Sequence, residues 1–181
     1  MEIGEVLALV RAFRAPGDGA CEKSQELILG MLESTPAPFR RTQFEPGHLT
    51  ATAMVRSADG ARVLLVHHRR LERWLLPGGH VEEQDATAGD SARREAIEET
   101  GAALTEDAPI LIGMDVHGIP PGKGEPFHLH HDLLFAFRAN AETLEVSEES
   151  HAVAWATPAE FEKYGIPPNI RLAWNRLVAA G

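Results

Sequence analysis

The sequence contains almost no cysteine and no long apolar segment. Its 181 residues include a single cysteine, Cys21, so no internal disulfide can form. No segment reaches the roughly 18 consecutive apolar residues that a transmembrane helix needs. Residues 1–5 lack the basic start and the apolar core of a signal peptide. From these absences we expect a cytoplasmic protein in which Cys21 is an incidental thiol.

Basic residues are also few, with 17 Lys and Arg against 27 Asp and Glu and a net charge of −10. This balance disfavours nonspecific binding to nucleic acid and to anionic membranes. The chain has the length of one domain, and 44% hydrophobic residues suffice for a core. We therefore expect a small-molecule partner, with neither nucleic acid nor membrane. A homodimer is the assembly that we consider beside a monomer.

The acidic residues concentrate where an ordinary surface helix would mix its charges. On a helix, Glu95, Glu98 and Glu99 lie at i, i+3 and i+4 and project from one face, where like charges repel. Mg²⁺ would remove this penalty, because it takes oxygen ligands and shares its shell with substrate phosphates. Arg94 is placed to pair with Glu98, and Gly101 is placed to end the helix. The pattern predicts metal-assisted phosphoryl chemistry with Mg²⁺, or Mn²⁺ as the alternative ion.

These residues, with the glycine-led loop before them, resemble the signature of the Nudix hydrolase family. Residues 94–102 match the Arg-Glu-apolar-x-Glu-Glu-x-Gly-apolar half of the signature, and residues 75–79 match its usual approach. Asp85 stands where the family normally has glutamate, and eight residues instead of seven separate it from Arg94. We expect the additional residue to lengthen the loop before the helix, near Gly89, and Asp85 to stand in for the glutamate.

The resemblance implies an α/β fold, namely the Nudix α/β/α sandwich built on a mixed sheet. We expect an N-terminal helical extension over residues 1–48 and the Nudix domain over residues 49–181. The elements that the sequence predicts are helices at 5–13, 22–33 and 170–180, a helix start at 157–161, and strands at 50–55, 62–68, 74–76, 110–116, 128–138 and 152–155.

The resemblance also implies a reaction and the residues that perform it. The reaction is Mg²⁺-dependent hydrolysis of a diphosphate bond in a nucleoside diphosphate linked to another moiety. The alternative is a Nudix-like regulator that binds a nucleotide without hydrolysing it. The expected catalytic residues are Arg94, Glu95, Glu98 and Glu99, and the expected metal ligands are the three glutamates with the backbone at Gly79.

Family members often draw an additional carboxylate from a loop before the last strand. Glu148 and Glu149 occupy that region here, and Asp85 is the third candidate for such a role.

A second polar group lies in the predicted strand 128–138, where His128, His130 and Asp132 alternate and so face one way. We expect these three side chains to line the substrate pocket, and zinc binding through imidazole nitrogens is the alternative. The preceding stretch 118–126 is rich in proline and glycine and predicts a loop at the pocket mouth. Lys123 in this loop could meet a substrate phosphate.

Overall fold

A computed structural model describes residues 1–122, 124–148 and 150–180. One mixed sheet of seven strands has the order β3-β2-β1-β6-β5, with β4 paired to β1 and β7 paired to β2. The strands are β1 His48–Arg56, β2 Val63–His68, β3 Arg73–Leu75, β4 Gly78–His80, β5 Ile110–Ile119, β6 His128–Arg138 and β7 Ser150–Ala156. The helices are α1 Ile3–Ala12, α2 Gly19–Ser34, α3 Ala88–Thr100, the 3₁₀ turn η1 Pro158–Glu160 and α4 Pro168–Ala180.

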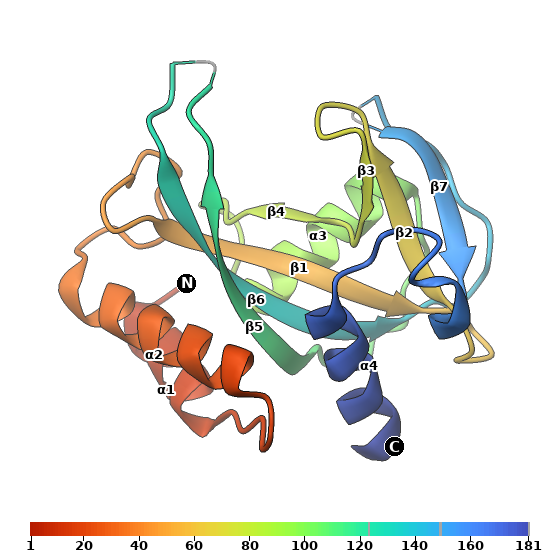
Figure 1. Ribbon diagram of the computed structural model, residues 1–181, viewed down its shortest axis with the longest axis horizontal. Helices are drawn as coiled ribbons and strands as arrows, with labels where there is room; N and C mark the ends of the chain where they lie inside the picture. The colour runs from red at the N-terminus through yellow and green to blue at the C-terminus, as the bar shows by residue number, and fades with distance from the viewer. Residues whose placement is uncertain (123, 149, 181) are drawn as a thin grey trace.

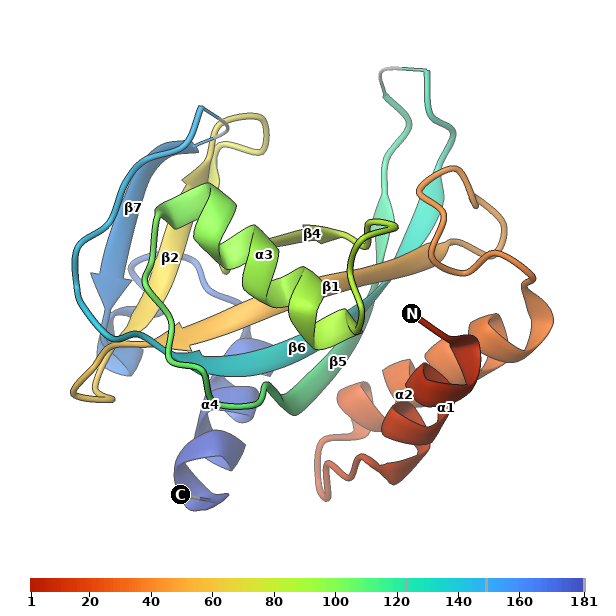
Figure 2. The same cartoon turned by 180° about the vertical axis from the view of Figure 1, so that it is seen from behind.

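Helices cover both faces of this sheet, which confirms the predicted α/β/α sandwich (Figures 1 and 2). On one face, α2 packs mainly on β5, α3 packs on β1 and β6, and α1 packs on α2, around one core that includes Val10, Ile28, Ala92 and Phe135. On the other face, η1 and α4 close a second core. Alternating side chains along each strand supply the two cores in turn. Within the described ranges, no helix has the length and apolar character needed to cross a membrane.

The N-terminal helices are joined to the sheet by apolar packing and to α4 by an ion pair. Val10 and Ile28 are fully buried in the same core as the strands. Asp18 caps α2 by accepting a hydrogen bond from the Cys21 amide at 3.1 Å, so this helix begins earlier than the sequence predicts. The other Asp18 oxygen accepts from Arg176 of α4 at 2.7 Å. Helices from opposite ends of the chain are therefore tied together.

Three details differ from the sequence prediction. Gly89 lies inside the first turn of α3 and not in a loop, because Thr87 and Asp90 form a capping box that starts the helix at Ala88. Strand β4 was not predicted, and β5 continues to Ile119, so the predicted loop 118–126 is shorter than expected. Packing explains why position 89 is a glycine, since a Cβ there would lie 2.4 Å from the side chain of Pro109.

Candidate active site on helix α3

Helix α3 presents its glutamates because its other side is buried. Ala88, Ala92 and Ala96 are fully or almost fully buried against the core, and their small side chains bring the helix close to the sheet. Gly101 ends the helix in the left-handed region at φ 64°, as the sequence predicts. The face that carries the carboxylates is thereby fixed relative to strands β1 and β4.

Two of the glutamates contact the glycine pair of β4. The Gly78 amide donates a hydrogen bond to Glu99 Oε2 at 3.1 Å. A Cβ at Gly79 would lie 2.6 Å from Glu95 Oε1 and 2.8 Å from Glu95 Oε2. Only a glycine allows the carboxylate to lie this close to the backbone.

Arg94 holds two carboxylates of the predicted set with one nitrogen. Its Nη1 donates to Glu95 Oε1 at 2.9 Å and to Glu98 Oε2 at 3.1 Å, which confirms the predicted pairing with Glu98. Its Nη2 donates to the carbonyl of His80 at 2.8 Å. The guanidinium thus fixes the helix carboxylates relative to β4, and these partners raise its pKa further, Asp85 most of all.

Asp85 is a further partner of Arg94 in this network. It is 5% exposed, and its two oxygens accept from Arg94 Nε at 3.1 Å and Nη2 at 3.0 Å. Burial alone would raise the pKa of Asp85, but the hydrogen bonds from Arg94 and from the Glu82 amide outweigh it and lower that pKa. Asp85 is therefore a carboxylate that positions Arg94.

Burial and neighbouring charges both act on the Glu95 carboxylate. Its pKa is raised, first by burial and then by the charges of Glu98 and Glu82, while Arg94 acts in the opposite direction. Glu98 is more exposed, with 59% of its side chain accessible, and lies beside Arg94. The carboxylate of Glu95 fills the space that a Cβ at Gly79 would need. Carboxylate oxygens are the donors that a hard divalent cation prefers.

A cleft of about 780 Å³ extends from this helix across the sheet. Its lining includes Thr50, Thr52, Gly78, Gly79, His80, Glu95, Glu99, Asp115, His117, His128, His130 and Asp132. The structure thus brings Glu95 and Glu99 to the same cleft as three further predicted residues, His128, His130 and Asp132. Glu148 is exposed and does not contribute to this lining. Lys123 and Glu149 lie outside the described residues.

Asp132 is held at the floor of the cleft. It is 8% exposed, and one oxygen accepts a hydrogen bond from Thr50 Oγ1 at 2.9 Å. Burial raises the pKa of Asp132, although hydrogen bonds from Thr52 and Thr50 act in the opposite direction. Asp115 lies opposite Asp132 on the neighbouring strand β5. Its Oδ2 lies 2.9 Å from Nδ1 of His117.

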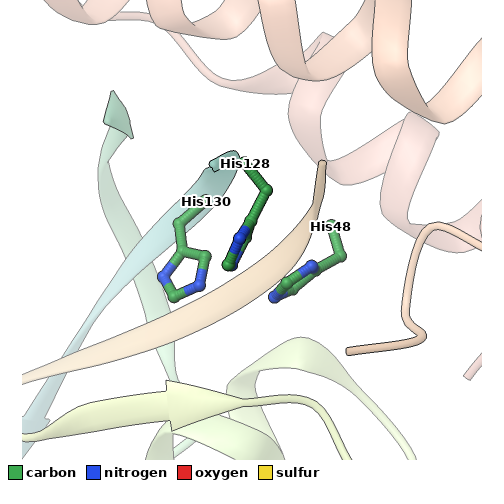
Figure 3. Close-up of side chains that lie close together, drawn as sticks. All are labelled: His48, His128 and His130. Carbon is green, nitrogen blue, oxygen red and sulfur yellow. The ribbon is translucent and has the colours of Figure 1, made fainter. Parts of the chain in front are cut away.

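Sequence reasoning missed His48, which lies beside His128 and His130 (Figure 3). Strands β1 and β6 run parallel with His48 opposite His130, so both project to one face, and His128 follows two residues away on the same face. His48 is two residues before Thr50, so strand alternation predicts that both side chains lie on the same face of the sheet. The sequence does not predict which residues His48 contacts, because its neighbours belong to a strand about 80 residues away and the register between the two strands is not set locally.

Comparisons with known proteins agree with the fold. The family model described as NUDIX domain matches residues 46–173. The chain belongs to the Nudix family. A search among curated proteins found no significant match.

Among solved structures, the chain is similar to RenU, a Nudix hydrolase from M. smegmatis, with 22% identity and a TM-score of 0.53 over 74% of this chain and 84% of the other. It is also similar to the NUDIX domain of NrtR from Shewanella oneidensis complexed with ADP-ribose, at 19% identity, with a TM-score of 0.56, 78% of this chain and 95% of the other. A third similar structure is an Ap4A hydrolase from C. elegans in a binary complex, at 18% identity, with a TM-score of 0.50, 72% of this chain and 95% of the other. At identities this low, the structural similarity shows a shared fold and nothing more.

Proposed function

We propose that this protein hydrolyses the diphosphate bond of a nucleoside diphosphate linked to another moiety, with Mg²⁺ as its cofactor and Mn²⁺ as a substitute. The observation that carries the proposal is the placement of the Glu95 and Glu99 carboxylates against the backbone of Gly78 and Gly79 at the edge of a large cleft. Membership of a family with hydrolase members supports the reaction class.

The proposed metal ligands are Glu95, Glu98, Glu99 and the backbone at Gly79. When bound there, Mg²⁺ would polarise phosphoryl oxygens and lower the pKa of the attacking water. Arg94 keeps two of the carboxylates at fixed positions through a single nitrogen. The positions of charged groups matter here, because preorganised charges act on the transition state without further rearrangement.

The substrate would extend along the cleft, away from α3. The diphosphate would lie beside the glutamates, and the second moiety would reach the end lined by His128, His130 and Asp132. Lys123 is proposed to meet a phosphate. Glu148 and Glu149 are proposed as additional carboxylates that a substrate-bound conformation could recruit.

The most direct test is a product screen over a panel of nucleotides. ADP-ribose and diadenosine tetraphosphate belong in it, because similar structures are named for binding or hydrolysing them. Each compound is incubated with Mg²⁺, with Mn²⁺ and with chelator, and the products are separated by anion-exchange chromatography. We expect cleavage of at least one diphosphate with Mg²⁺ and none with chelator.

The alternative function, a nucleotide-binding regulator, gives a different result in the same experiment. Such a protein would bind a panel member in calorimetry and form no product with either metal. That outcome would contradict the proposed hydrolysis. Glu98→Gln serves as the active-site variant and Glu83→Gln, at an exposed loop acid nearby, as its matched control.

A further inference from the structure

Histidine side chains are concentrated at the end of the cleft away from the middle of α3. Five of the nine histidines of the chain contact one another there: His48, His80, His117, His128 and His130. The proposed hydrolysis uses the carboxylates of the helix, and it gives His128 and His130 contact with the substrate but no part in the reaction. Imidazoles this close repel one another when protonated, so the cluster needs a reason of its own.

Three of these rings place ligand atoms together. The candidate nitrogens of His48, His128 and His130 all lie within 4.8 Å of one another (Figure 3). A tetrahedral Zn²⁺ with bonds of about 2.0–2.1 Å holds its nitrogens about 3.4 Å apart, so a modest approach of the rings would complete a site.

Hydrogen bonds already orient two of the rings for ligation. His48 Nδ1 lies 3.1 Å from the carbonyl oxygen of Gln43, and His128 Nδ1 lies 2.9 Å from the carbonyl oxygen of Pro126. A carbonyl can only accept, so each Nδ1 must carry the proton, and each Nε2 is then left with a lone pair. Histidine ligands of metals commonly have such a partner on the second ring nitrogen.

The ring atoms that remain are buried and lack partners. Among the described residues, nothing hydrogen-bonds to the Nε2 atoms of His48 and His130, and His48 is completely buried. A buried polar atom without a partner is costly unless a ligand satisfies it.

We propose that His48, His128 and His130 form a second metal site that binds a transition-metal cation of the zinc class, separate from the Mg²⁺ site of helix α3. Three nitrogen donors suit Zn²⁺, whereas Mg²⁺ prefers oxygen. Asp132, an expected neighbour of such a site, instead accepts a hydrogen bond from Thr50, and His48 takes the third position. Three protein ligands leave one tetrahedral position for water or for a substrate oxygen. This inference does not depend on the proposed hydrolysis.

The test is equilibrium dialysis of tag-free protein against Zn²⁺ in a large excess of Mg²⁺, with metal content measured by mass spectrometry. The excess Mg²⁺ occupies oxygen sites, so we expect one Zn²⁺ per chain to remain. His128→Asn and His130→Asn should each weaken that binding by more than about 100-fold, the upper figure for loss of an outer-shell partner of a metal ligand. His151→Asn, outside the cluster on β7, is the matched control and should bind as the unaltered protein does.

Two further measurements keep the result interpretable. Zn²⁺ should raise the melting temperature of the unaltered protein and of Glu98→Gln, and should leave that of the histidine variants unchanged. Co²⁺ in place of Zn²⁺ should give the visible absorption of a tetrahedral nitrogen site, lost in His130→Asn. Absence of retained Zn²⁺, or retention that survives both histidine substitutions, would overturn the proposal. Failed hydrolysis with retained Zn²⁺ would contradict only the proposed reaction.

Discussion

Gly79→Ala is a small change that should separate catalysis from stability. The new Cβ would lie 2.6 Å from Glu95 Oε1, and ordinary contact begins at 3.4 Å, so the carboxylate must move by about 0.8 Å. The atoms it meets are the far end of a flexible side chain, and Gly79 does not have a positive φ, so the fold should adjust at little cost. A misplacement of about 1 Å at a catalytic group can lower turnover by about 100-fold, which is about 2.7 kcal/mol.

The neighbouring position supplies the control. In Gly78→Ala the new Cβ would lie 2.8 Å from the carbonyl oxygen of Ala51 and 2.8 Å from Thr52 Cα, which are backbone atoms of β1. Backbone of a central strand cannot yield as a carboxylate can, so this variant should lose melting temperature as well as activity.

Turnover of the unaltered protein and of both variants is measured at saturating Mg²⁺ on a nucleotide that the panel shows to be cleaved. The melting temperature of each protein is measured by circular dichroism. We expect Gly79→Ala to keep its melting temperature within about 3 °C, which is under about 1 kcal/mol for a chain of this size, while turnover falls about 100-fold. Unchanged turnover in Gly79→Ala would refute the role of the Glu95 carboxylate. A loss of melting temperature equal to that of Gly78→Ala would refute the argument from flexibility.

Three other substitutions test the network and the packing. Glu98→Gln keeps the size of the side chain and removes its charge, and turnover should fall on the order of 100-fold or more. Asp85→Ala removes the acceptor of two Arg94 hydrogen bonds, so the free energy of unfolding should fall by about 2 kcal/mol and turnover should fall with it. Asp18→Ala leaves Arg176 without its buried partner, and the loss should be about 3 kcal/mol, or about 6–12 °C in melting temperature, with little change in turnover per folded molecule.

Exposed acids provide the matched controls for these three variants. Glu83→Gln should leave turnover unchanged, since its side chain is exposed in the loop before α3. Glu33→Ala removes an exposed ion pair with Arg11 and should cost less than about 1 kcal/mol. Wild-type turnover in Glu98→Gln, unchanged melting and turnover in Asp85→Ala, or an Asp18→Ala loss as small as that of Glu33→Ala would each contradict the corresponding assignment.

The features that sequence reasoning predicted correctly depend on local spacing. Helix periodicity places Glu95 and Glu99 within one turn, and a glycine at position 101 can take the left-handed conformation that ends α3. Strand alternation likewise puts His128 and His130 on one face of β6, whose predicted bounds agree with the structure.

Features that depend on tertiary pairing could not be read in this way. Strand β4 is three residues long and contains two glycines, so its strand conformation comes from pairing with Thr50 and its neighbours in β1. The attachment of Asp85 to Arg94 needs the path of the loop between β4 and α3, which spacing does not give. The spacing predicts a loop for the additional residue near Gly89, whereas the capping box of Thr87 and Asp90 begins α3 at Ala88 and so includes Gly89 in the helix.

The two ends of the cleft differ in the ligand atoms that they offer. Because of this difference, the proposed Mg²⁺ and Zn²⁺ would bind at separate ends and would not compete for one site. The helix end offers the carboxylate oxygens of Glu95 and Glu99, and the other end offers imidazole nitrogens beside Asp132, which accepts a hydrogen bond from Thr50. Hard Mg²⁺ gains little from nitrogen donors, and three histidines bind Zn²⁺ in preference to Mg²⁺. His80 joins the two ends, since its carbonyl accepts from Arg94 while its ring lies 5.1 Å from that of His48. A substrate that spans the cleft would therefore meet both proposed cations, and removal of Zn²⁺ alone should change substrate affinity more than turnover.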